Sequence, residues 1–198
     1  MKHALWLVAC LAACEANDDS NPAAADGGAA DGGVVEVPDA APESTEAELI
    51  AAQIACESEN LAPPALVGRA FEAGFVLEGP AVASTTALYL LPGPASRQRF
   101  AELIGPIFGA MNANDGLLAQ ATTYDDTCGV ARTFTLWRDQ AAMYTFVGSD
   151  AHVAAVEATA ELGFPGSVVT HWEVPAEAFP PSWDDALERV LTAREVGP

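Results

Sequence analysis

This 198-residue chain has few basic residues: 8 Lys and Arg stand against 28 Asp and Glu, which gives a formal net charge of −20. Proteins that bind a nucleic-acid backbone do so chiefly by neutralising its phosphates with Lys and Arg. The scarcity of basic residues therefore excludes nucleic acid as a partner. The negative charge is instead typical of a soluble, well-hydrated surface.

The sequence also lacks the short motifs that mark several common enzyme classes. It contains no Gly-Lys-Ser/Thr phosphate loop, no Gly-x-Gly-x-x-Gly dinucleotide turn, no His-Glu-x-x-His zinc motif and no Gly-x-Ser-x-Gly nucleophile elbow. These absences remove support for hydrolase and nucleotide-dependent functions. We expect no cofactor and no resident metal.

The apolar run near the N-terminus is too short to cross a bilayer, for which about twenty apolar residues are needed. Lys2 and His3 precede this run, residues 4–13, and Cys14 follows it, which is the pattern of a signal peptide. The tetrad Leu11-Ala12-Ala13-Cys14 resembles the bacterial lipobox, whose Cys is acylated and becomes the new N-terminus. The tetrad that ends at Cys10 also fits, but leaves a shorter apolar run before it. A plain secretory signal is the alternative.

We therefore expect a lipoprotein of the bacterial cell envelope, facing the periplasm or the cell exterior. Its contact with the membrane is through the lipid on Cys14 alone. Residues 1–14 are the predicted signal peptide and residues 15–43 a flexible linker of Ala, Gly, Asp and Pro, which has too little apolar surface to fold. Residues 44–198 form the predicted domain.

Periodicity within this domain predicts alternating helices and strands. Thr45 and Glu48 have the spacing of a capping box at the start of the first helix, and Pro106 is expected to kink or break the second. The predicted helices cover 45–60, 94–113, 140–147, 150–162 and 182–194, and the predicted strands cover 82–91, 117–124, 130–138 and 167–174.

From residue 82 the order is strand, helix, strand, strand, helix, strand. This order predicts an α+β, ferredoxin-like antiparallel sheet with helices on one face, and an additional N-terminal helix. In the strand at 130–138, Val130, Arg132 and Phe134 alternate with Ala131 and Thr133, so neither face is cleanly polar. Because a sheet of this kind is normally covered on both faces, the second face predicts a homodimer.

The segment TFTLWRDQAAMYTFVGSDAHVAAVEATAEL, residues 133–162, resembles the antibiotic biosynthesis monooxygenase-like group of dimeric α+β barrels. The resemblance covers about residues 80–175. It implies that group's functions, which include oxygenation of phenolic or polyketide substrates without metal or flavin, and haem degradation. Haem-degrading members use an Asn, a Trp and a His, whereas this chain has Ser84 or Thr86, Phe146 and an early His, which argues against haem degradation.

Several side chains are candidates for a site. His152 is a candidate general base or hydrogen-bond donor to a bound phenol, or else a residue that only caps and packs its helix. We predict an apolar ligand pocket lined by the aromatic residues Trp137, Tyr89, Phe134 and Trp172. The alternative is that these residues make only core or dimer contacts.

Two further sets of polar residues have alternative interpretations. His171 and Glu173 share one face of the last strand and, with Asp150 or His152, could hold a metal, although a structural pair is the preferred interpretation. Arg132 and Arg138 could bind a substrate carboxylate, but we favour ion pairs with the nearby acids Asp125, Asp126 and Asp139.

Four cysteines complete the set of informative residues. Cys10 leaves with the signal peptide and Cys14 carries lipid, so Cys56 and Cys128 remain in an oxidising compartment. We predict a disulfide between them, with two unrelated thiols as the alternative.

Together these features predict a membrane-tethered lipoprotein that is non-catalytic and binds a small apolar ligand or an envelope partner. The alternative is a cofactor-independent monooxygenase that acts on a phenolic or polyketide-like substrate, with His152 and Trp137 shaping its site.

Overall fold

A computed structural model of the chain describes residues 45–163 and 166–196. Four strands form one antiparallel sheet in the spatial order β2-β3-β1-β4. The strands are β1 (Ala81–Tyr89), β2 (Leu117–Asp125), β3 (Val130–Trp137) and β4 (Val168–Val174). The helix between β1 and β2 is α2 (Pro94–Asn112), and α3 (Gln140–Val147) and α4 (Asp150–Leu162) lie between β3 and β4. This order and topology confirm the ferredoxin-like α+β prediction.

Side-chain caps at the starts of several helices match the sequence signals. Thr45 and Glu48 form a capping box at the start of α1 (Glu46–Asn60). Asp139 Oδ1 accepts a hydrogen bond from the backbone N–H of Ala142 at 2.7 Å. Pro106 lies inside α2 with its side chain exposed, and the helix continues past it to Asn112. The predicted break at Pro106 therefore does not occur.

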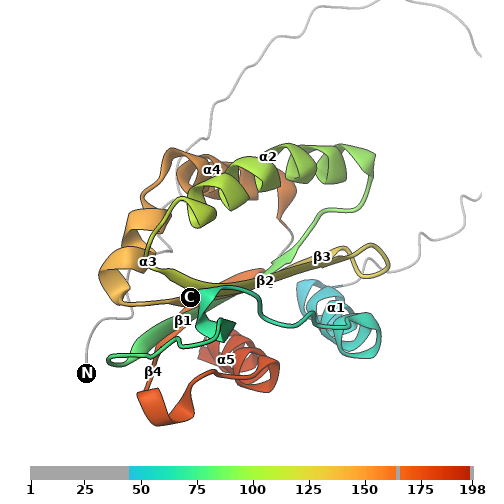
Figure 1. The fold of residues 1–198 in the computed structure, drawn as a ribbon. Helices are drawn as coiled ribbons and strands as arrows, with labels where there is room; N and C mark the ends of the chain where they lie inside the picture. The colour runs from blue at the N-terminus through green and yellow to red at the C-terminus, as the bar shows by residue number, and fades with distance from the viewer. Residues whose placement is uncertain (1–44, 164–165, 197–198) are drawn as a thin grey trace, which may run out of the picture. The chain divides into compact units, whose positions relative to one another are not determined.

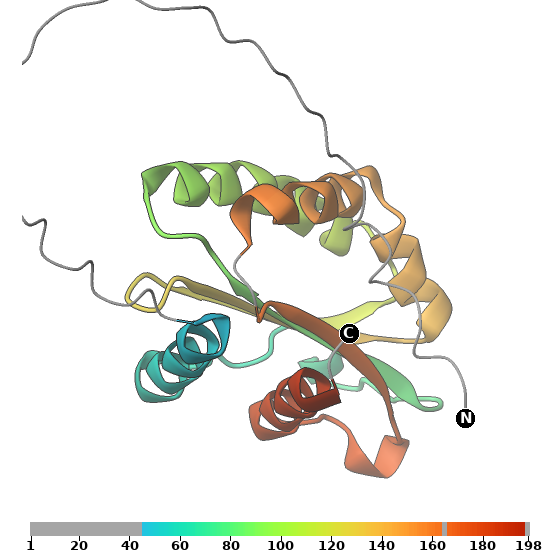
Figure 2. The same cartoon turned by 180° about the vertical axis from the view of Figure 1, so that it is seen from behind.

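Helices lie on both faces of the sheet (Figures 1 and 2). α2 and α4 pack against each other on one face, which we call the α2/α4 face, and α3 lies at one end of it. The terminal helices α1 and α5 (Trp183–Val196) lie on the opposite α1/α5 face. The second face is therefore not open, in contrast to the expectation from the strand pattern.

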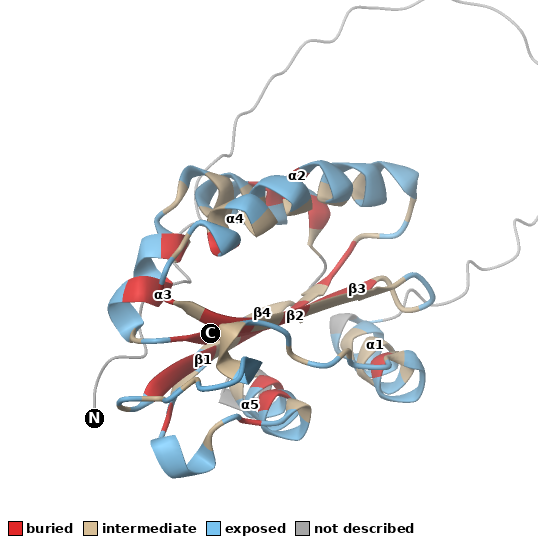
Figure 3. Ribbon diagram, viewed as in Figure 1, coloured by how far each residue is buried: buried red, intermediate tan, exposed pale blue. Residues whose placement is uncertain are grey.

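α5 covers its face of the sheet because one side of the helix is small and apolar. Ala186 and Val190, one turn apart, are completely buried, and Ala186 joins the cluster formed by Ala83 and Phe134 of the sheet. Burial is concentrated in the sheet and on the helix sides that face it (Figure 3). The homodimer was predicted because one face of the sheet was expected to be uncovered. The terminal helices cover that face, so this argument for a dimer no longer applies, and the homodimer stays an untested prediction.

Along residues 45–163 and 166–196, no helix combines the length and apolar character needed to cross a membrane. The predicted signal peptide, Cys14 and the linker at 15–43 fall outside the described residues.

Candidate functional site

The alternation of side chains along β1 divides the sheet into two chemically different faces. Val82 packs with Met111 of α2 on the α2/α4 face, and Ala83 packs with Ala186 of α5 on the other. Residues that pair directly across antiparallel strands point to the same side. The pairing registers therefore assign the strand residues to a face.

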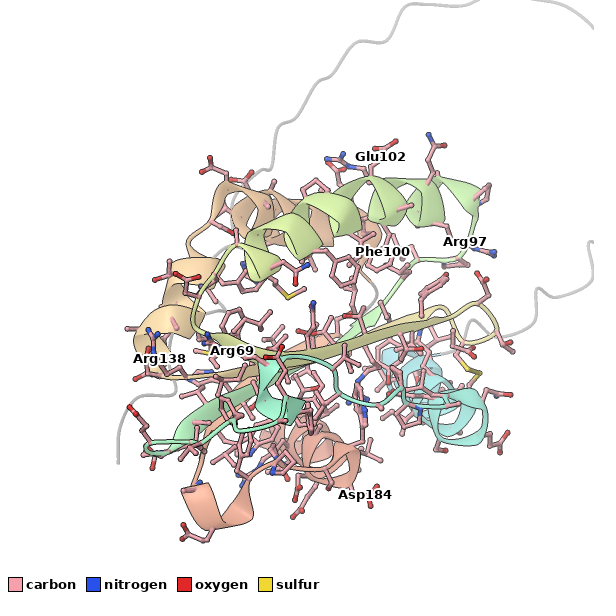
Figure 4. All side chains as sticks on the ribbon, in the orientation of Figure 1. Arg69, Arg97, Phe100, Glu102, Arg138 and Asp184 are labelled. Carbon is pink, nitrogen blue, oxygen red and sulfur yellow. A yellow bond between two sulfur atoms is a disulfide. The ribbon has the colours of Figure 1, made fainter. Side chains whose placement is uncertain are left out.

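Two apolar clusters occupy opposite ends of the α2/α4 face. The first surrounds Trp137 and consists of Val82, Met111, Trp137, Ala142, Met143 and Phe146. The second lies at the other end and consists of Leu90, Leu103, Ala158 and Leu162. Phe100 of α2 points toward the sheet at this end, and its ring centroid lies 5.7 Å from that of Tyr124 (Figure 4). Both ends of the α2/α4 face are thus closed by packed side chains.

Between these clusters the sheet carries polar side chains. Ser84 pairs with Thr135, which pairs in turn with Gln120, and Thr86 pairs in the same way with Thr133 and Thr122. Both rows therefore point toward α2 and α4. We call this set the hydroxyl band: Ser84, Thr86, Gln120, Thr122, Thr133 and Thr135.

The hydroxyl band keeps some contact with solvent although it lies in the middle of the sheet. Thr85 of β1 has 0% exposure on the α1/α5 face, whereas its neighbours Ser84 and Thr86 are half-buried. Two atoms of the band, Thr122 Oγ1 and Gln120 Oε1, are buried and have no hydrogen-bond partner among the described residues. Because buried polar atoms are normally paired, a water molecule or a ligand group is needed to satisfy them.

His152 lies next to the first apolar cluster. Its ring meets Phe146 edge to face, with centroids 4.9 Å apart, and Phe146 stacks on Trp137 at 5.3 Å. Burial lowers the pKa of His152 from its ordinary 6.5, and the backbone of Val147 opposes this shift in part. The imidazole is therefore neutral at pH 7. The cap of α4 is Ser149, whose Oγ accepts a hydrogen bond from the backbone N–H of His152 at 3.3 Å, so the His152 side chain packs against Phe146 but does not cap the helix.

The four predicted ligand-lining aromatics do not surround one space. Trp137 points to the α2/α4 face, while Phe134, Trp172 and Tyr89 point to the other face, where helices α1 and α5 cover them. Phe134 stacks on Trp172 at 5.9 Å and meets Trp183 of α5 edge to face at 5.2 Å. Only Trp137 therefore adjoins the hydroxyl band.

Arg132 forms a buried ion pair that the sequence did not indicate. Its guanidinium contacts Glu57 of α1 and not the acids near the strand ends, and the Tyr89 hydroxyl donates to Glu57 Oε2 at 2.6 Å. All three side chains are buried. One sequence signal could have predicted the contact between Glu57 and Arg132. Glu57 follows Cys56, and the disulfide partner of Cys56, Cys128, lies four residues before Arg132. Arg138 pairs with Asp139 at 2.9 Å, as predicted.

His171 and Glu173 lie exposed on β4, on the α2/α4 face, and the His171 ring contacts Tyr144 with centroids 6.2 Å apart. Within the part of the chain that the structure describes, no group of three or more His, Cys, Asp or Glu side chains is placed to hold a metal ion.

The predicted disulfide between Cys56 and Cys128 is confirmed, with Cα atoms 5.7 Å apart. It ties α1 to the turn between β2 and β3. Asp125 Oδ1 accepts from the backbone N–H of Cys128 at 2.8 Å, and Gly129 adopts a left-handed φ of 62°, which Gly takes without strain. The turn thus presents Cys128 to α1.

No protein-family profile matches this sequence, and no curated protein matches it. Solved structures with a similar fold include Rv0793 from Mycobacterium tuberculosis, with 21% identity and a TM-score of 0.41 over 46% of this chain and 92% of that one. A candidate antibiotic biosynthesis monooxygenase from Caulobacter crescentus is 20% identical, with a TM-score of 0.41 over 48% and 89%. SnoaB, a cofactor-independent oxygenase from Streptomyces nogalater, is 14% identical, with a TM-score of 0.38 over 52% and 98%.

Proposed function

We propose that this protein is a lipid-anchored envelope protein whose ferredoxin-like domain binds a small, largely apolar ligand at the hydroxyl band. The ligand carries oxygen substituents, as phenols and polyketides do. The observation that supports this proposal most directly is a half-buried polar band between two apolar clusters, with two buried polar atoms that have no hydrogen-bond partner in residues 45–163 and 166–196.

The composition of the band indicates the chemistry of the ligand. Hydroxyl and amide groups can both donate and accept hydrogen bonds, and none of the six band residues is charged. The flanking clusters supply apolar and aromatic surface, including Trp137 and Phe146. Ligand sites generally combine such apolar walls with a few placed polar groups. A neutral, planar molecule with one or two oxygens fits this arrangement better than an ion.

Adjacent threonines on β2 give a matched test of ligand binding. Thr122 points into the band, whereas Thr123 pairs with Arg132 and points to the α1/α5 face. Thr122→Val should weaken binding of phenols and quinols about five- to tenfold, because one hydrogen bond contributes roughly 1 kcal/mol. Thr123→Val should leave binding unchanged. Isothermal titration calorimetry with a panel of phenols and quinols measures both.

The stability of the same variants separates binding from folding. Because Thr122 Oγ1 is buried without a partner among the described residues, Thr122→Val should not lower the free energy of unfolding. A Thr122→Val variant that is less stable but binds ligand normally would show that the band is only structural.

The neutral protonation state of the His152 imidazole favours one alternative function, a cofactor-independent monooxygenase. A neutral imidazole beside an aromatic cluster is suited to take the proton of a bound phenol. Incubation with phenolic substrates under oxygen, with product analysis, separates the two functions. Turnover that falls in His152→Ala supports the enzyme, and saturable uptake without turnover supports the binding protein.

Attachment through Cys14 is tested by metabolic labelling with a radioactive fatty acid in a bacterial host. Cys14→Ser should abolish labelling and release the protein from the membrane fraction, because acyl chains supply about 0.8 kcal/mol per buried CH₂. Cys10→Ser, the matched variant at the other candidate tetrad, should retain label. Labelling that is lost only in Cys10→Ser would move the anchor to that position.

A further inference from the structure

A pocket of about 410 Å³ lies between α1, the β2–β3 turn and the segment that follows β1. Its apolar lining includes Leu49 and Ala52 of α1, and Leu90 and Leu91 after β1. The disulfide residues Cys56 and Cys128 also line it, so two of its walls are covalently joined. A covalent link of this kind fixes the pocket before a ligand arrives, which reduces the entropy cost of binding.

One polar atom in this pocket finds no partner in the described part of the chain. Gln53 Oε1 is buried and makes no hydrogen bond to any described residue, although its side chain lines the pocket. Tyr124 also lines it, and burial together with the nearby Asp126 carboxylate raises the pKa of its phenol. The phenol therefore stays protonated at neutral pH, with its O–H engaged by the Asp126 side chain.

The charged groups of the pocket largely cancel. Arg97 lies beside the β2–β3 turn (Figure 4), and its Nη1 pairs with Asp126 Oδ1 at 3.4 Å. Both side chains are more than half exposed, so they belong to the rim. An apolar wall, a neutral interior amide and a balanced rim favour an uncharged ligand, and the net charge of −20 disfavours an anion.

We propose that this pocket binds a small neutral alcohol or phenol, whose hydroxyl pairs with the Gln53 amide while its apolar body contacts Leu49, Leu90 and Leu91. This site is separate from the hydroxyl band, because the pocket lining includes none of the band residues. Its occupancy does not depend on the function proposed above.

Ligand-observed fluorine NMR on the whole chain carrying Cys14→Ser tests the proposal with two probes, para-fluorophenol and fluorobenzene. The wild-type pocket should bind the phenol about fivefold more tightly than fluorobenzene, the gain of one neutral hydrogen bond. Gln53→Leu should remove this difference and leave fluorobenzene binding unchanged. Leu49→Asp, at an exposed position of α1, should weaken both probes about tenfold, since it places a charge in the apolar wall.

Thr122→Val serves as the control for the hydroxyl band: it weakens phenol binding only at the band, so the part of phenol binding that depends on Gln53, and the binding of fluorobenzene, should remain. The proposal is overturned if neither probe shows saturable binding, or if Gln53→Leu and Leu49→Asp both bind like the wild type. Phenol binding that is lost in Thr122→Val but retained in Gln53→Leu also overturns it, because the phenol then occupies the hydroxyl band. That last result would support the function proposed for the band, so the two proposals fail separately.

Discussion

Methionine in place of Arg132 should lower the free energy of unfolding by about 3–5 kcal/mol, the usual cost of breaking a buried ion pair from one side. The Glu57 carboxylate would remain buried without its cation, since Glu57 and Arg132 are only 4% and 1% exposed. The Tyr89 hydroxyl would still donate to Glu57, but one neutral donor does not replace a guanidinium. Urea denaturation followed by circular dichroism measures the loss.

A second variant distinguishes the lost ion pair from lost packing. Glu57→Met combined with Arg132→Met removes both charges, so it should be more stable than Arg132→Met alone by at least about 1 kcal/mol. Arg138→Met is the matched control, because Arg138 pairs with Asp139 at an exposed site and should cost less than about 1 kcal/mol. If the double variant is as unstable as the sum of its single changes, the pair is not coupled and the argument fails.

Removal of the disulfide, by Cys56→Ser with Cys128→Ser, should lower the free energy of unfolding by about 4 kcal/mol. The bond joins residues 72 positions apart, and the chain-entropy model assigns an effect of this size to so long a loop. Urea titrations of the variant and of the wild type, with and without a reducing agent, measure the change. The reduced wild type should match the variant.

Ser58→Ala, also on α1 but exposed, is the control for substitution in this helix and should change stability by less than about 0.5 kcal/mol. A loss below about 1 kcal/mol in the double-cysteine variant would mean that the remaining contacts hold α1 without the bond. Because Cys56 adjoins Glu57, the effects of removing the disulfide and the ion pair should not be additive.

These predictions concern α1, which together with α5 occupies the sheet face where a second copy was expected. Tyr89, Arg132 and Phe134 all point to this face, and each contacts a residue of a terminal helix. A two-fold contact between copies of this chain must therefore use another surface, or else displace these helices.

The elements themselves were predictable from the sequence because their signals are local. Thr45 with Glu48, Asp139 and Ser149 each cap a helix through contacts within three residues, and strand periodicity requires only neighbouring positions. The order of elements then left few topologies to consider. The disulfide was predictable for a different reason, since only two cysteines remained to pair.

The site was less predictable, because each of its features depends on residues far apart in the chain. Trp137, Phe146 and His152 lie close together in the chain and meet in the structure, but the orientation of Tyr89, Phe134 and Trp172 depends on helices whose position no local pattern gives. The sequence by itself determined the helices, the strands, their order and the cysteine pair. The tertiary structure alone decided which face each helix covers, that Glu57 meets Arg132 and that a polar band lies beneath α2 and α4, because burial and pairing of these groups arise only when distant segments pack together.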